Sequence, residues 1–196
     1  MLSVIAALVL GPASQYSFTG PFVEGCSCGS ACSFEISGKL PGCKAVGFFA
    51  FDDGTYQGRS LRGGKVAFAA GSTGWLRLYY DGPSSSVRQA SRDFIKAALA
   101  DWGNPEAVEH REITVAGSKG FYIAQVADGK IMELQTEPVM ADARPIEYKN
   151  IFNKALHPNI MQAKTTLGRF HEGNRAFQLQ GTNAFFYDKV RAAGKL

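Results

Sequence analysis

The stretch SSSVRQASRDFIKAALADWG, residues 84–103, has the clearest helical period in this sequence. Apolar residues recur in it at spacings of three and four, from Val87 to Trp102. Its opening serines suit an N-cap, and Gly103 suits a C-terminal stop. The pattern predicts one principal helix over about residues 85–102, with an apolar stripe that packs on a sheet.

Strand-like runs lie on both sides of this helix. β-Branched and aromatic residues alternate or cluster in residues 15–25, 46–51, 56–61, 66–69, 75–80, 110–117 and 120–136. Asp53-Gly54 and Asp128-Gly129 are hairpin signals, because glycine tolerates a positive φ. The order of strands, one helix and more strands predicts an α+β fold. We expect a mostly antiparallel sheet or sandwich with the helix packed on it.

The segments after the second hairpin signal are less regular. Residues 137–165 hold three prolines and little period, which predicts a long loop with a short helix near residues 149–155. The tail can supply one or two final strands and, after Thr182, a short terminal helix. We interpret residues 14–196 as a single β-rich domain, because a chain of 196 residues can bury one substantial core.

The first 13 residues carry no charged side chain. Their apolar core, residues 4–10, is far shorter than the roughly 20 residues that span a bilayer. It has the length of the apolar region of a signal peptide, and Gly11 and Ala13 supply small residues for cleavage. We therefore expect residues 1–13 to be the leader of a periplasmic or otherwise exported protein, or a hydrophobic anchor that attaches it to the membrane. A buried first strand is the alternative.

Charge and motifs narrow the function classes. The net charge of +4 comes from basic residues that are scattered singly, without the clustering that a nucleic-acid surface needs. We therefore expect no nucleic-acid partner. The sequence also contains no H-E-x-x-H and no P-loop. These absences favour a role without catalysis and leave enzyme activity open.

All four cysteines fall in the window EGCSCGSACSFEISGKLPGC, residues 24–43. Their spacing is C-x-C-x3-C-x10-C, formed by Cys26, Cys28, Cys32 and Cys43. The small residues between the first three let the backbone fold tightly around one centre. Clustered thiolates bind soft ions, above all Cu(I) and Zn(II). Two or three sulfurs suit Cu(I), and four suit a structural zinc.

Two other interpretations of the cysteines stay open. An exported protein with an even number of cysteines usually pairs them as disulfides. The easier pairings are Cys28–Cys43 with Cys26–Cys32, or Cys26–Cys43 with Cys28–Cys32, because a Cys26–Cys28 bond closes a very small ring. Thiol–disulfide exchange is the third interpretation, and it is the least favoured because the window has no C-x-x-C.

Outside the window, His171 beside Glu172 is our first choice for an auxiliary metal ligand, although an isolated His-Glu pair is more often a solvated turn. His110 is expected at the surface and His157 in a loop. Three methionines can act as thioether ligands of copper, but they form no M-x-x-M cluster, so core packing is the simpler interpretation. These are Met132, Met140 and Met161.

The cysteine window and its surroundings resemble the bacterial domain of unknown function 1326 family. The likeness covers roughly residues 16–105, with an aromatic residue, a glycine and a glutamate before C-x-C-x3-C, and then a glycine turn and L-x-G. The matching positions are Tyr16, Gly20, Glu24, Cys26, Cys28, Cys32, Cys43, Gly54, Tyr56, Leu61 and Gly63. Members often carry C-P-C where this chain reads Cys32-Ser33-Phe34, so one thiol is missing here. The resemblance implies a shared fold and a cysteine-centred site without a known activity.

The leading hypothesis is an exported protein that binds Cu(I) or Zn(II) through these cysteines for metal carriage, buffering or sensing. The alternative is a non-enzymatic interaction module, or an accessory subunit of a membrane-associated complex, in which disulfides staple the cysteine loop. In that case the aromatic tail NAFFYDKV, residues 183–190, is the expected contact patch for a protein partner.

Overall fold

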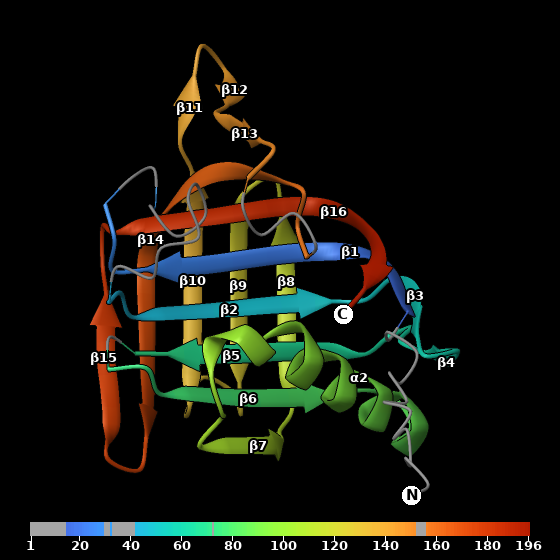
Figure 1. Cartoon of the computed structure of the whole chain (residues 1–196). Helices are drawn as coiled ribbons and strands as arrows, with labels where there is room; N and C mark the ends of the chain where they lie inside the picture. Colours follow the sequence, from blue (N-terminus) through green and yellow to red (C-terminus); the bar gives the residue numbers. More distant parts are fainter. Residues whose placement is uncertain (1–14, 30–31, 33–41, 72, 152–155) are drawn as a thin grey trace, which may run out of the picture.

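The computed structural model describes residues 15–29, 32, 42–71, 73–151 and 156–196, and the expected leader, residues 1–13, lies outside them. Figure 1 shows a strand-rich chain with the helix α2 on one side. The helices are α2 (Ser85–Ala98) and the short 3-10 helix η1 (Ala100–Trp102). The strands are β1 (Gln15–Cys26), β2 (Ala45–Ala50), β3 (Asp53–Tyr56), β4 (Arg59–Ser60), β5 (Lys65–Ala70), β6 (Leu76–Asp81), β7 (Ala107–His110), β8 (Ile113–Ser118), β9 (Phe121–Val126), β10 (Met132–Pro138), β11 (Met140–Ala141), β12 (Arg144–Pro145), β13 (Glu147–Lys149), β14 (Asn159–Glu172), β15 (Arg175–Leu179) and β16 (Asn183–Lys195).

α2 and η1 together cover the segment predicted as the principal helix, which confirms that prediction. The Ser84 hydroxyl accepts a hydrogen bond from the Val87 backbone N–H at 3.2 Å and so caps the first turn. Gly103 follows η1 with a φ of 113°, a conformation that glycine adopts most easily. α2 packs on the sheet beside β6 and β5, and the buried ring of Phe94 contacts Phe18 of β1 and Tyr56 of β3. Within the described ranges, no helix is both long and apolar enough to cross a membrane.

One pair of strands, joined through the helix, is the exception to antiparallel pairing among the described strands. The main sheet has 14 strands, and its central path runs β7-β6-β5-β2-β1-β16-β14-β10-β9-β8. β6 and β7 pair in parallel, whereas the other described pairs are antiparallel. A parallel pair needs a crossover connection, and α2 supplies it between β6 and β7. The sheet predicted as mostly antiparallel is therefore a mixed sheet within a β-dominated α+β fold.

The sheet curls so that it forms two layers. Figure 1 shows β1, β2, β5, β6 and β16 side by side in front, with β8, β9 and β10 running across behind them. β14 joins the layers because it pairs with β16 through residues 161–164 and with β10 through residues 163–170. The C-terminal strands β14 and β16 therefore connect the front layer with the layer behind it.

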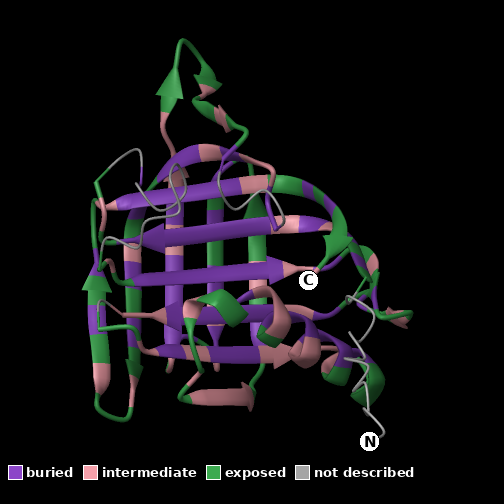
Figure 2. Cartoon of the chain, viewed as in Figure 1, coloured by how far each residue is buried: buried purple, intermediate pink, exposed green. Residues whose placement is uncertain are grey.

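The centre of the front layer, formed by β2, β5 and the second half of β1, is buried on both faces and is mostly purple in Figure 2. Side chains such as Val46, Phe48 and Phe186 fill the space between the layers, which we call the interlayer core. Phe49 and Phe94 belong to a second cluster on the opposite face, toward α2, which we call the helix-side core. Cys26 and Cys32 lie in the helix-side core, so the cysteine window begins inside the protein.

The prediction of a long loop over residues 137–165 is wrong. β11 and β12 form a hairpin there, β13 follows, and the first half of β14 begins at Asn159. β11, β12 and β13 are two or three residues long and include Pro145, so they give no measurable alternation in the sequence. Residues 152–155, which include most of the expected short helix, lie outside the described residues.

The terminal helix predicted after Thr182 is also wrong, because residues 183–195 form β16. β16 pairs with β1 from Gln15 opposite Lys195 to Gly25 opposite Ala184, and this long ladder outweighs the weak local helix preference of the alanines. Phe185 and Phe186 are 1% and 0% exposed. The aromatic tail is thus part of the core and is not the contact patch that the sequence suggested.

The Asp53-Gly54 pair is not the hairpin turn that was predicted. Both residues belong to β3, and the turn follows at Gln57 and Gly58, whose φ angles are 50° and 74°. A Cβ on Gly54 would lie 2.3 Å from the Ser17 carbonyl oxygen. Glycine is needed at this position for the close approach of β3 to β1. The Asp128-Gly129 turn between β9 and β10 is confirmed.

Candidate metal centre

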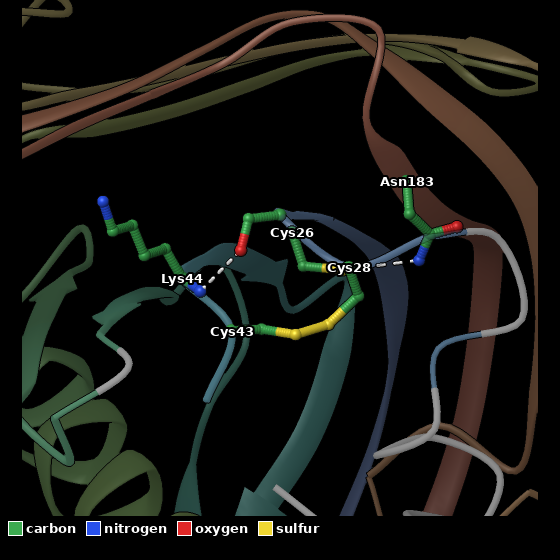
Figure 3. The surroundings of a disulfide bond; sticks show 6 residues. Cys26, Cys28, Cys43, Lys44 and Asn183 are labelled. Carbon is green, nitrogen blue, oxygen red and sulfur yellow. Dashed lines mark hydrogen bonds between the residues drawn. A yellow bond between two sulfur atoms is a disulfide. The ribbon is translucent and has the colours of Figure 1, made fainter. Parts of the chain in front are cut away.

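Cys28 and Cys43 face each other because the ladder between β1 and β2 continues beyond the strands. The two strands pair antiparallel up to the C-terminal end of β1. One step further, the Ser27 N–H donates to the Lys44 carbonyl at 2.8 Å, and the Lys44 N–H donates to Ser27 Oγ at 2.9 Å. The next opposed pair is Cys28 and Cys43, whose Cα atoms lie 5.8 Å apart and whose sulfurs form a disulfide (Figure 3). This is one of the pairings that the spacing had left open.

Cys26 and Cys32 are reduced and lie beside this disulfide. Cys26 ends β1 and is 2% exposed, and Cys32 is 4% exposed. The Sγ atoms of Cys26, Cys28 and Cys32 all lie within 4.8 Å of one another. Sulfurs that share one tetrahedral ion through bonds of about 2.3 Å lie roughly 3.8 Å apart. Three of the predicted ligands therefore come together in a group that can hold a metal ion after a small contraction.

A chain of polar side chains leads from the neighbouring strands to Cys26. Asn183, the first residue of β16, donates from Nδ2 to Cys26 Sγ at 3.3 Å (Figure 3). Its Oδ1 accepts a hydrogen bond from Gln162 Nε2 at 2.6 Å. Gln162 Oε1 in turn accepts from the Tyr148 hydroxyl at 3.0 Å. This series of hydrogen bonds fixes the orientation of the Asn183 amide. Its oxygen already accepts a hydrogen bond from Gln162, so its nitrogen points at the sulfur.

The surroundings of Cys26 raise the pKa of its thiol above the ordinary value. The hydrogen bond with Cys32 is the largest cause, followed by burial and by the charge of Glu24. The Asn183 amide acts in the opposite direction, because it donates to the sulfur. Glu24 is 3% exposed and lies two residues before Cys26 in β1, on the same face. The buried negative charge that opposes a thiolate also attracts a cation to the sulfurs.

His171 lies far along β14 from the sulfur group. It is exposed, and it lines a pocket of about 380 Å³ with Asp128, Lys130 and Arg169. Among the described residues, the group close enough to share a metal ion consists of the three cysteines and does not include His171. The structure thus brings Cys26, Cys28 and Cys32 together, places Cys43 in the disulfide, and leaves His171 elsewhere.

The remaining candidate ligands are also dispersed. Met132 is fully buried in the interlayer core, and Met161 packs against the same core. Met140 is 49% exposed in the β11–β12 hairpin. His157 is buried and stacks on the ring of Phe22 with centroids 4.3 Å apart. These positions favour packing roles for Met132, Met161 and His157.

A pocket of about 360 Å³ lies beside Cys28. We call it the Cys28 pocket. Ile146 and Tyr148 supply apolar surface to its wall, and Gln162 and Asn183 supply polar surface. The pocket therefore borders the polar side chains that reach Cys26 and also one of the two cysteines of the disulfide.

The fold and the site define a strand-rich α+β protein with a buried cysteine centre next to a cross-strand disulfide. No protein-family model matches the chain, and no curated protein matches it either.

Proposed function

We propose that the protein binds a soft metal ion, Cu(I) or Zn(II), through the thiolates of Cys26, Cys28 and Cys32. The observation that carries the proposal is the convergence of their sulfur atoms within 4.8 Å of one another. Thiolate ligands select Cu(I) and Zn(II) over hard cations such as Mg²⁺ and Ca²⁺. The burial of Cys26 and Cys32 keeps water from the ion, which suits retention of a metal rather than turnover of a substrate.

The Cys28–Cys43 disulfide sets how many ligands are available. With the disulfide intact, Cys26 and Cys32 offer two thiols, and two thiolates suit Cu(I). Reduction adds Cys28 as a third ligand, and three thiolates with one open position also suit Zn(II). We therefore expect the oxidised protein to bind Cu(I) alone and the reduced protein to bind both ions.

The role that fits such a site is metal carriage, buffering or sensing. We place this role in the periplasm or another exported compartment, with residues 1–13 as a leader or as an anchor to the membrane. The resemblance of residues 16–105 to the domain of unknown function 1326 family supports a cysteine-centred site, and we propose a shared fold with that family.

Metal content and thiol content, measured together, test the proposal. The protein is purified without oxygen, with and without reductant, and its copper and zinc are measured by elemental analysis beside a thiol titration. We expect an equimolar soft metal in the reduced protein. Cys26→Ser and Cys32→Ser should each lose it, whereas Cys43→Ser, the matched control in the same window, should retain it. Metal-free protein with all four cysteines oxidised would remove the proposal.

A second candidate function is the disulfide-stapled interaction module or accessory subunit. The observations that favour it are the Cys28–Cys43 disulfide and two neighbouring apolar side chains on β9, Phe121 and Ile123, which are 63% and 50% exposed. Intact mass before and after reduction separates the two functions. An interaction module should contain two disulfides in the native protein, and a metal carrier should contain at least two thiols.

A further inference from the structure

Cys28, one of the two cysteines of the disulfide, lies at the wall of the Cys28 pocket. Among the described residues, Cys28 lines the Cys28 pocket and Cys43 does not. Gly29 and Lys164 also line this pocket, and both are exposed, so the pocket opens to solvent. Its volume of about 360 Å³ is within the range of small-ligand sites. The pocket therefore gives a thiol on a short peptide a route to Cys28 Sγ.

Two thiols lie next to the same sulfur. Cys26 and Cys32 are reduced and buried, and their Sγ atoms lie within 4.8 Å of Cys28 Sγ. Thiolates attack disulfides through a mixed-disulfide intermediate, and access decides which sulfur is attacked. A thiol already held next to the reacting sulfur has a large advantage over one that must diffuse to it. Any adduct formed on Cys28 is therefore exposed to rapid attack from within the protein.

We propose that Cys26, Cys28, Cys32 and Cys43 form a thiol–disulfide exchange site whose substrate is a short peptide thiol. In the first step the substrate thiolate attacks Cys28 Sγ. A bond forms between the two sulfurs, the Cys28–Cys43 bond breaks, and Cys43 leaves with the electron pair and takes up a proton. In the second step Cys32 gives up its proton and attacks Cys28 Sγ, and the substrate leaves as its thiolate.

The two steps balance without an added oxidant. One disulfide is present before and after, and it moves from Cys28–Cys43 to Cys28–Cys32. A second substrate thiol that attacks the mixed disulfide at the substrate sulfur instead yields an oxidised substrate dimer and a fully reduced protein. The exchange needs no metal ion, so metal-free protein tests it apart from the proposed metal binding.

The experiment uses metal-free oxidised protein, with glutathione as the probe. Samples are quenched with acid, alkylated and digested with trypsin, which cuts after Lys39 and Lys44 and so places Cys43 on a peptide of its own. We expect a glutathione adduct on Cys28 at early times, together with alkylated Cys43. The adduct should then decay as Cys28 becomes linked to Cys32. An adduct on Cys43, or one that never decays, overturns the proposal.

Two variants test the parts separately. In Cys26→Ala/Cys32→Ala the Cys28 adduct should accumulate. An unchanged adduct lifetime contradicts the second step, in which a buried cysteine removes the substrate from Cys28.

An added Cβ at Gly29 meets nothing within 4 Å, so Gly29→Phe should fold and narrow the pocket. We expect Gly29→Phe to lower the rate at which glutathione forms the Cys28 adduct several-fold. The smaller thiol 2-mercaptoethanol should form its adduct almost as fast as before. Thr166→Phe, at an exposed position of β14 outside the pocket lining, is the control. Equal rates for glutathione in Gly29→Phe and in the control contradict entry through the pocket.

Discussion

Asn183 donates a hydrogen bond to the sulfur of Cys26 at 3.3 Å, although the two residues are 157 positions apart in the sequence. The bond joins the start of β16 to the end of β1, which are neighbours in the sheet. A donor aimed at a sulfur stabilises its thiolate and fixes the direction of its lone pairs. The pairing of β1 with β16 is thus what supplies the centre with a group that orients one of its ligands.

We expect Asn183→Leu to weaken metal binding by about 10–100-fold, the usual cost of removing a group that orients a metal ligand. Leucine keeps most of the side-chain volume and removes the donor to Cys26. Competition for Cu(I) against a chromophoric chelator, in reduced protein, measures the affinity. The Cu(I)–thiolate absorption should also shift, because the sulfur loses its hydrogen bond.

Asn104→Leu is the matched control, because Asn104 is exposed on the coil after η1. It should bind Cu(I) as the unchanged protein does. If Asn183→Leu matches this control in affinity and in spectrum, Asn183 has no part in positioning the sulfur.

The sequence predicted those features that depend on local pattern. The helix at residues 85–102 and the Asp128-Gly129 turn carry their signals within a few residues, and both are present. The close grouping of Cys26, Cys28 and Cys32 also follows from their short spacing. Composition alone indicated a β-rich chain.

Features that depend on register between distant strands could not be predicted. The Cys28–Cys43 pairing follows from the β1–β2 ladder, which the spacing of cysteines does not encode. Asn183 has no local signal at all, because its role exists only where β16 pairs with β1. Gly54 looked like a turn glycine, but it serves the close approach of β3 to β1, and only the packed sheet distinguishes these uses.

Cys43→Ser and Cys28→Ser should have different effects on metal binding under oxygen-free conditions without reductant. Cys43→Ser releases Cys28 from the disulfide, so the full group of three thiols becomes available, and we expect Cu(I) to bind more tightly than in the unchanged protein. Cys28→Ser removes a member of the group and should leave the affinity no higher. The same chelator competition measures both.

The pair of variants is its own control, because each breaks the same disulfide. Any general effect of loop loosening is shared, and the two differ only in which sulfur remains. Equal affinities in Cys43→Ser and Cys28→Ser would show that Cys28 is not a ligand.

Glu172→Ala should destabilise the fold by about 2–4 kcal/mol, because it leaves the buried Tyr79 hydroxyl without its acceptor and removes one of the two carboxylate partners of Arg77. Glu172 Oε2 accepts from the Tyr79 hydroxyl and from Arg77 Nη1, each at 2.6 Å. Tyr79 is 0% exposed, and burial together with Glu172 raises the pKa of its hydroxyl, so the group stays a donor. Urea unfolding at neutral pH measures the loss.

Glu172→Gln keeps an acceptor for the Tyr79 hydroxyl, so its free energy of unfolding should fall less than that of Glu172→Ala. Glu147→Ala is the control, because its partner Lys149 has a side chain that is 64% exposed, and such pairs contribute at most about 1 kcal/mol. A loss in Glu172→Ala no larger than in Glu147→Ala would mean that the contacts between β6 and β14 contribute little.

His157 should make the fold sensitive to mild acid. Complete burial lowers the pKa of its imidazole from 6.5 to about 3. Between those two values the unfolded chain binds a proton that the folded protein does not, so the free energy of unfolding falls as the pH is lowered. The slope is about 1.4 kcal/mol for each pH unit below 6.5 and vanishes near pH 3.

Carboxylates titrate in the same window, so the contribution of His157 is isolated by difference. His157→Phe removes the titrating group and keeps a ring that can stack on Phe22. Between pH 7 and pH 4, we expect the unchanged protein to lose about 3 kcal/mol more stability than His157→Phe, as measured by urea unfolding at each pH. Parallel pH profiles for the two proteins would mean that His157 reaches solvent or gains a proton acceptor in the folded state, and the acid sensitivity would then have to arise from the carboxylates alone.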